Sequence, residues 1–212
     1  GIMKKAIGII ILGLLWCNLS YANESAKSLL GIKLMDDLNK YENWKNEFDS
    51  NTAEDTWGIY NHHIKSKVKN DYFSEMIGVR IGKDLKIYTI RIYGKSLTNK
   101  FSCNSLTTHL FNFKKEKFKN EGYKFKYSLD QFGNKMDGAN KGATFYKLNP
   151  TTDKLSEDIR LESFCEDNGT RPMFIMVDHL NIYKIITPNM KKFYKGLEKM
   201  RKEEEKNKEK GF

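Results

Sequence analysis

The sequence predicts an α+β fold: an antiparallel sheet of about five to six strands packed against one main helix, with a charged C-terminal helical tail. Residues 60–69, 77–81 and 85–93 alternate apolar and polar side chains, which is the period of a half-buried strand. Apolar residues then recur every three or four positions from Cys103, as they do on one face of a helix. Two cysteines lie on the predicted inner faces of this helix and of a later strand.

The beginning of the sequence has the features of an export signal. Two lysines precede an apolar run over residues 6–16, and Ser20 and Ala22 give the small-x-small pattern that a signal peptidase accepts. The run is shorter than the ~20 residues that a membrane-spanning helix needs. We therefore expect residues 1–22 to be a cleaved signal peptide. A retained N-terminal anchor and lipid attachment at Cys17 are the alternatives.

Three segments follow from this reading: a signal peptide (1–22), a single α+β domain (23–188) and a charged helical or frayed tail (189–212). Hydrophobic residues make up 39% of the chain and aromatic residues 13%, which excludes a disordered protein. The formal net charge of +10 would suggest nucleic acid as the partner of a cytoplasmic protein. In a periplasmic or secreted bacterial protein we expect no nucleic acid and no transmembrane span after signal cleavage. The expected partner is then an anionic envelope component or an acidic protein.

The domain opens with a short strand-like run over residues 29–34. Asp36 or Asp37 is expected to cap a short helix that ends near Trp44, because a short polar side chain can accept a hydrogen bond from the first free backbone N–H groups. Residues 46–56 are polar and are expected to form a loop.

The three alternating runs come next and predict an antiparallel meander. The turn formers Gly82-Lys83-Asp84 separate the second run from the third. Ser102 is then expected to cap the main helix, and Gly122 is expected to end it. The predicted apolar face of this helix comprises Cys103, Leu106, Leu110 and Phe113.

Further short strands are predicted after the helix, at residues 123–127, 143–148, 159–165 and 173–177. Asn168-Gly169 is a typical hairpin turn between the last two. Beyond Pro188 the composition changes, because residues 191–210 carry nine Lys or Arg and five Glu. Phe193, Leu197 and Met200 recur there at helical spacing, which predicts a helix that begins docked and ends frayed.

Cys103 and Cys165 are the two cysteines that remain after signal cleavage. An even pair in an exported protein predicts a disulfide, which would restrict the unfolded chain by about 4 kcal/mol. The alternatives are a metal pair or a catalytic thiol assisted by His109. Neither cysteine has a CxxC or CxxH neighbour, which favours the disulfide.

A row of basic side chains, His63, Lys65, Lys67 and Lys69, is predicted on one face of the strand at 60–69. One interpretation is an anion-binding surface. The other is an edge strand that lysines protect against pairing with another chain. The basic and aromatic residues interleaved from Arg91 to Tyr127 have a similar double interpretation, and a solvated helix face with lysine stems over apolar surface is favoured.

Catalytic and cofactor motifs are missing from the sequence: GxSxG, HExxH, a phosphate loop and GxGxxG are all absent. His62-His63 is a poor metal pair because adjacent residues of a strand point to opposite faces. The loop after Asp130 lacks the calcium ligands at Phe132 and Lys141. We therefore assign no cofactor, no metal and no catalytic residue, and expect turn chemistry around Asp130.

The most consistent function is a non-enzymatic binding or envelope-associated protein. The alternative is a small periplasmic hydrolase with a non-local site, in which His109 or His179 would act with an Asp or Glu.

Several segments resemble those of a known group: the signal from Lys4 to Ala22, the opening at residues 30–37, the run at 86–90, the helix from Cys103 and the strand ending at Cys165. They are similar to the uncharacterised small exported proteins of AT-rich marine alphaproteobacteria. The resemblance spans most of the chain after the signal. It implies a periplasmic location and this architecture, and it implies no activity.

Overall fold

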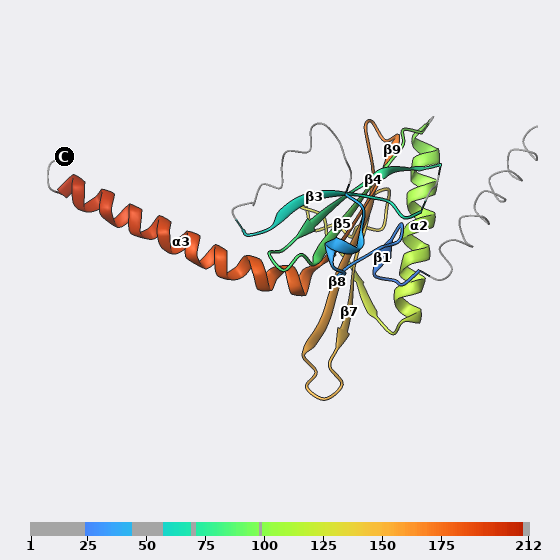
Figure 1. Ribbon diagram of the computed structural model, residues 1–212. Coiled ribbons are helices and arrows are strands. Elements are labelled where there is room, and N and C mark those ends of the chain that lie inside the picture. The colour runs from blue at the N-terminus through green and yellow to red at the C-terminus, as the bar shows by residue number, and fades with distance from the viewer. Residues whose placement is uncertain (1–23, 44–56, 69–70, 98, 210–212) are drawn as a thin grey trace, which may run out of the picture.

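Seven antiparallel strands form the main sheet, in the order β3-β4-β5-β9-β8-β7-β6 (Figure 1). The computed structural model describes residues 24–43, 57–68, 71–97 and 99–209. Within these residues the α+β class is confirmed, with more strands in the sheet than expected and a separate two-stranded sheet, β1-β2. The predicted signal peptide and the loop at 46–56 lie outside the described residues.

The strands of the main sheet are β3 (Tyr60–Lys65), β4 (Phe73–Ile81), β5 (Ile87–Gly94), β6 (Lys124–Tyr127), β7 (Lys141–Leu148), β8 (Leu155–Glu166) and β9 (Arg171–Asp178). The meander of β3, β4 and β5 is confirmed. After β5 the chain leaves the sheet for helix α2 (Lys100–Asn120) and returns at the far edge as β6. The remaining strands then fill the sheet back to β5, so that β9 pairs with β5.

Two turns were predicted correctly. Asp167, Asn168 and Gly169 all adopt positive φ between β8 and β9, which is the conformation that Asn and Gly favour in a tight turn. Asp130 accepts the backbone N–H of Phe132 and of Asn134, each at 2.8 Å, so its carboxylate closes a turn.

The run at 29–34 is a hairpin rather than one strand. β1 (Ser28–Leu29) pairs with β2 (Ile32–Lys33), and Leu30 and Gly31 between them have φ values of 49° and 78°. Two consecutive residues with positive φ reverse the chain in a two-residue turn. A short 3-10 helix follows at Leu38–Lys40, where Asp37 accepts the N–H of Asn39 at 2.9 Å and so fulfils the predicted cap.

Helix α2 covers one face of the sheet (Figure 1). Its cap is Asn99, which accepts the N–H of Ser102 at 2.8 Å, so the prediction of Ser102 as the cap was wrong. Asn99 caps the helix instead because its backbone is extended and its side chain reaches the N–H of Ser102, three residues later. The end near Gly122 is confirmed, and this glycine has a φ of 83°.

The buried side of α2 differs from the predicted one. Its buried residues are Cys103, Thr107, Phe111, Lys114 and Phe118. Leu106, Leu110 and Phe113 lie at the border and are partly buried, so the predicted face was wrong beyond Cys103. The aromatic rings decide the orientation, because Phe118 stacks on Phe145 of the sheet with ring centroids 4.3 Å apart.

Residues 24–43 form an N-terminal strap that crosses α2. The buried ammonium of Lys114 donates to Glu24 Oε2 at 2.8 Å and to the carbonyl oxygens of Ser25 and Ser28. Burial lowers the pKa of Lys114, and the Glu24 carboxylate opposes this shift. One lysine of α2 therefore binds the strap at Glu24, Ser25 and Ser28.

Two further contacts fix the strap to distant parts of the chain. The N–H of Ala26 donates to Glu121 Oε1 at 2.6 Å, and Lys27 Nζ lies 2.8 Å from Glu157 Oε2 on β8. Burial raises the pKa of Glu157, but hydrogen bonds from Lys27 and Tyr123 outweigh this and hold the pKa below its ordinary value. The strap therefore belongs to the core and is not a loose leader.

Helix α3 runs from His179 to Glu209 and extends away from the sheet (Figure 1). It starts ten residues before the predicted tail and continues through Pro188. Proline removes a hydrogen bond inside a helix, which is why the sequence suggested a boundary there. Ile182 is buried against Ile59 and Tyr88, and this small cluster is where α3 docks. No helix among the described residues is long and apolar enough to cross a membrane.

Candidate anion-binding site on the second face of the sheet

The face of the sheet opposite α2, here called the second face, carries polar side chains from alternate positions of β3, β4 and β5. In the strand pairing, His63 lies opposite Gly78, and Gly78 lies opposite Arg91. The neighbouring residues Ile64 and Ile92 point to the α2 side and belong to the core. Because side chains alternate along a strand, His63 and Arg91 point to the second face.

A second row lies beside the first, two residues along each strand. Asn61 pairs with Arg80, and Arg80 pairs with Thr89. Residues two apart on a strand share a face, so Arg80 lies diagonally next to Arg91, with backbones about 7–8 Å apart. Both arginines therefore belong to the second face, and both line the same hollow.

Gly78 forms the floor between His63 and Arg91. A Cβ atom at this position would lie 3.3 Å from Tyr93 Oη and 3.7 Å from Arg91 Cβ. The tyrosine hydroxyl therefore occupies the space above the glycine. Any larger residue at position 78 would have to push this ring aside.

These rows enclose a hollow of about 250 Å³, here called the sheet pocket. It is lined by Asn61, His62, His63, Gly78, Val79, Arg80, Thr89, Arg91 and Tyr93. None of these lining residues is a carboxylate, whereas two are arginines, two are histidines and others carry N–H or O–H donors. The pocket as described therefore favours a negatively charged group.

Two polar atoms at the sheet pocket have no internal partner. Arg91 Nε and Thr89 Oγ1 are buried and have no hydrogen-bond partner among the described residues. Thr89 as a whole is only 4% exposed, so water reaches it poorly. A buried donor without a partner is costly, and a bound acceptor would remove this cost.

The predicted basic row is not one surface. His63 lines the sheet pocket, but β3 ends at Lys65, whose ammonium lies 3.5 Å from Glu42 of the strap. Lys67 lies over the ring of Tyr41 at 4.4 Å, and Lys69 lies outside the described residues. The prediction of a continuous strand to 69 was wrong, because the chain turns after Lys65 to pack on the strap.

The other interpretation of the basic row, an edge strand protected by lysines, agrees better with the topology, because β3 is an edge strand of the sheet. The strap covers part of this edge: Asn43 bridges to Ile64, and the N–H of Lys65 donates to the carbonyl of Glu42 at 2.8 Å. Tyr41 on the strap donates to Asp36 at 2.7 Å. Burial and this hydrogen bond raise the pKa of Tyr41 to about 12.

Sequence reasoning missed Arg80, Arg91, Thr89 and Tyr93 as site residues. Arg91 was noted only as part of a basic stretch that continues into α2. Its alternation with Ile90 and Ile92 indicates a polar side chain on one face of a strand. The partner strand and its register are not visible in that pattern, so the neighbourhood of Arg80 and Arg91 could not be derived.

Within the basic stretch from Arg91 to Tyr127, two lysines lie over aromatic rings, which agrees with the interpretation that their stems cover apolar surface. Lys115 lies over the rings of Phe125 and Tyr127, and Lys117 lies over the ring of Phe113, at 5.5–5.8 Å from the ring centroids. These lysine stems cover apolar surface between α2 and the edge strand β6.

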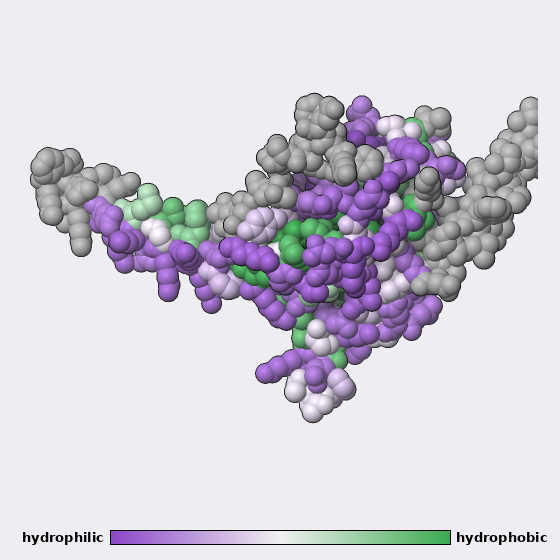
Figure 2. Space-filling view, in the orientation of Figure 1, coloured by the Kyte–Doolittle hydropathy of each residue, from purple (hydrophilic) through white to green (hydrophobic). Residues whose placement is uncertain are grey.

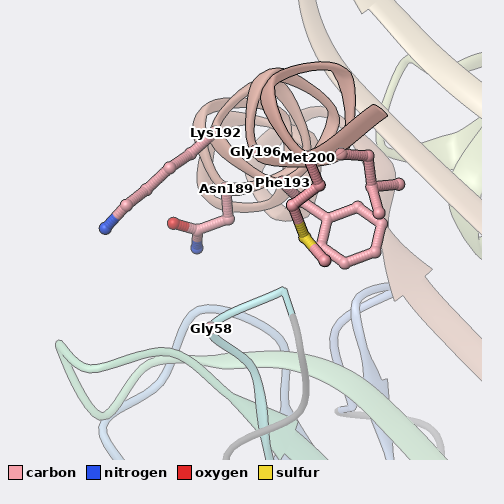
Figure 3. Close-up of a pocket in the computed structure, with 7 residues that line it drawn as sticks. Gly58, Asn189, Lys192, Phe193, Gly196 and Met200 are labelled. Carbon is pink, nitrogen blue, oxygen red and sulfur yellow. The ribbon is translucent and has the colours of Figure 1, made fainter. Parts of the chain in front are cut away.

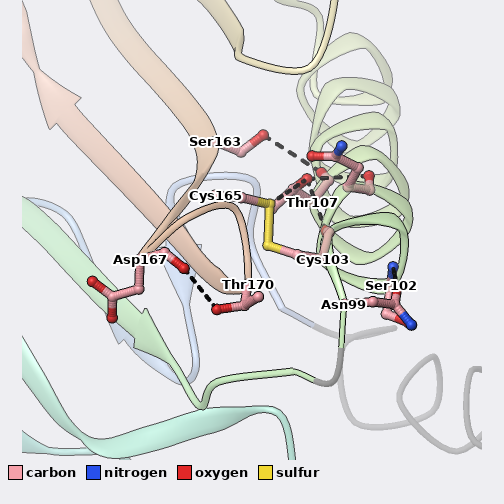
Figure 4. Close-up of a disulfide and its surroundings, with 9 residues drawn as sticks. Asn99, Ser102, Cys103, Thr107, Ser163, Cys165, Asp167 and Thr170 are labelled. Atoms are coloured by element: carbon pink, nitrogen blue, oxygen red, sulfur yellow. Dashed lines mark hydrogen bonds between the residues drawn. A yellow bond between two sulfur atoms is a disulfide. The ribbon is translucent and has the colours of Figure 1, made fainter.

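Cys103 and Cys165 are joined by a disulfide, with Cα atoms 6.2 Å apart (Figure 4). Cys103 is fully buried in the first turn of α2, and Cys165 lies on β8. Thr107 Oγ1 contacts Cys165 Sγ at 3.9 Å. The bond fastens the helix to the sheet as predicted, so neither Cys103 nor Cys165 is a free thiol that could act with His109.

The histidines do not gather into a metal or catalytic cluster. His109 is exposed on α2, whereas His179 at the start of α3 lies near Asp158 and Arg160, which point to the second face. Burial lowers the pKa of His179. No group of three or more His, Cys, Asp or Glu among the described residues could hold a metal ion.

Comparisons with protein-family models, with curated proteins and with solved structures found no match. The resemblance to small exported alphaproteobacterial proteins therefore stays a prediction.

Proposed function

We propose that this protein is a non-enzymatic binding protein of the bacterial envelope that takes an oxyanion, a carboxylate or phosphate group, into the sheet pocket. The observation that carries the proposal is the pair of buried, unpartnered atoms Arg91 Nε and Thr89 Oγ1 beside a second guanidinium. Guanidinium groups bind carboxylate and phosphate in a bidentate fork, and threonine and tyrosine hydroxyls add single donors.

The size of the pocket limits the ligand. A hollow of about 250 Å³ is below the ~300–1,000 Å³ of pockets for drug-sized molecules. It therefore fits a small anion or the charged end of a larger molecule.

Two features support the proposed envelope location. The N-terminal pattern of residues 1–22 and the disulfide between α2 and β8 both favour an oxidising compartment. The mass of the protein recovered from a bacterial periplasm tests this part: we expect a chain that begins at Asn23, and a chain that retains Met3 would contradict it. The hydrolase alternative stays a prediction.

The binding test uses isothermal titration calorimetry with inorganic phosphate and with succinate in a low-salt buffer. We expect one site per chain, and we expect Arg91→Gln to weaken binding at least about tenfold, because a charge-assisted hydrogen bond is lost. Arg171→Gln is the matched control. Its guanidinium lies 3.0 Å from Glu166 at the β8–β9 turn and does not line the pocket, so its binding should equal that of the wild type.

Thr89→Val provides a second variant that keeps the shape and the charges of the pocket. It removes only the buried hydroxyl, and we expect a loss of about three- to tenfold. Equal affinity in the wild type and Arg91→Gln, with both folded by thermal melting, would overturn the proposal. Absence of binding for both probes would overturn it as well.

A further inference from the structure

The outer half of α3 carries an apolar stripe that the body of the protein does not cover. Phe193, Leu197 and Met200 follow each other at steps of four and three residues and are 42%, 45% and 59% exposed. This spacing places them on one side of the helix. In Figure 2 the hydrophobic side chains on the outer part of α3 lie beyond the body of the molecule.

The inner end of this stripe borders a hollow. Phe193 packs edge-on against Trp57 with ring centroids 5.6 Å apart, and Asn189 Nδ2 donates to the carbonyl of Trp57 at 2.7 Å. Beyond this contact, α3 and Gly58 enclose a space of about 410 Å³ (Figure 3). Phe193 and Met200 project into it from the helix.

Charged residues border the stripe in an ordered way. Lys192 and Glu203 are eleven residues apart, which is three helical turns, so both lie on the same border of the stripe. Tyr194 and Arg201 are seven residues apart and share the other border. Each border thus has complementary groups at equal distances on either side of a point close to Leu197.

This arrangement is self-complementary under a two-fold axis. When two copies of α3 lie antiparallel and cross near Leu197, Lys192 of each copy faces Glu203 of the other. Tyr194 of each copy likewise faces Arg201 of the other, which favours stacking of a guanidinium on an aromatic ring. Gly196 beside the crossing point has no side chain and allows the helices a close approach.

We propose that the stripe on α3 binds the α3 of a second copy in an antiparallel pair. The pair buries Phe193, Leu197 and Met200 from both chains and closes the hollow at Gly58. The two borders fix the direction, because a parallel pair would place the Lys192 border of one copy against the Tyr194 border of the other and lose both pairings. This surface is separate from the sheet pocket, so the two proposals stand or fall independently.

The test measures the mass of the purified protein by size-exclusion chromatography with light scattering over a range of concentrations. We expect a dimer for the wild type. Leu197→Ser with Met200→Ser should raise the dimer dissociation constant at least about tenfold, since exposed apolar area drives association. The matched control is Leu148→Ser with Leu155→Ser, a paired set of exposed leucines (40% and 42%) at the β7–β8 hairpin, which should leave the dimer intact.

A charge exchange tests the direction of the pair. Lys192→Glu should weaken the dimer about tenfold, and Lys192→Glu combined with Glu203→Lys should restore it. Circular dichroism checks that each variant keeps its helices, and Arg91→Gln should dimerise like the wild type. A wild type that stays monomeric at the highest concentration overturns the proposal. So does a monomer that sediments with phosphatidylglycerol vesicles through α3, because the stripe would then bind lipid.

Discussion

The two helices have similar charge and very different roles. Within Lys100–Asn120 of α2 there are five lysines and one glutamate, and α3 up to Glu203 has seven Lys or Arg and two glutamates. Yet five side chains along α2 are buried, one of them Lys114, whereas Ile182 is the one buried side chain among the described residues of α3. Positive charge in a helical sequence therefore does not indicate a ligand surface. Whether a helix packs along the sheet depends on its apolar side chains and, in α2, on the disulfide from Cys103.

Among the contacts that hold α2 but not α3 to the sheet, the disulfide is expected to contribute most to the free energy of unfolding. Cys103→Ser with Cys165→Ser opens a loop with a sequence separation of 62 residues. We expect the free energy of unfolding to fall by about 4 kcal/mol, because the unfolded chain regains the freedom that the bond removed. Urea unfolding followed by tryptophan fluorescence measures this.

Leu197→Ser on α3 is the control for that experiment and should change the free energy of unfolding by less than about 0.5 kcal/mol at a concentration where the chain is monomeric. A loss below about 1 kcal/mol for the cysteine variant would show that α2 is held by packing alone.

A smaller loss, about 3 kcal/mol, is expected for Lys114→Met. The change leaves the Glu24 carboxylate and two strap carbonyls without their donor in a buried place. Burial lowers the pKa of Lys114 while Glu24 opposes the shift, so each charge depends on the other, and removing Lys114 alone leaves the Glu24 carboxylate without its compensating charge. Adding Glu24→Gln to Lys114→Met should therefore recover part of the loss.

The matched control is Lys195→Met on α3, an exposed lysine, with an expected change of less than about 0.5 kcal/mol. Equal losses for Lys114→Met and Lys195→Met in urea unfolding would remove the distinction between the two helices.

Much of the fold was predictable because its signals are local. Period-two runs gave β3, β4 and β5, and Asn168-Gly169 gave the turn into β9, since side-chain alternation and backbone φ are properties of short segments. The buried side of α2 was not predictable in the same way. Cys103, Thr107, Phe111, Lys114 and Phe118 include a lysine and a threonine, whose burial depends on the strap that supplies their partners.

The candidate site was less accessible to sequence reasoning than the fold. His63 was identified from a basic alternation, and it does line the sheet pocket, but its predicted companions Lys65 and Lys67 bind the strap. Arg80 and Arg91 are neighbours only through the register of β4 and β5. Register depends on turn geometry and on which face is buried, and the sequence of one strand alone determines neither.

The strap also constrains the order in which the structure can be completed. Its contact to Lys114 spans 90 residues of sequence, and its contact to Glu157 spans 130. A chain that emerges from its N-terminus first therefore presents Leu29, Leu30 and Ile32, all buried in the finished protein, long before their covering surface exists. The earliest part of the domain to appear during synthesis is therefore among the last whose apolar side chains are covered by the rest of the fold.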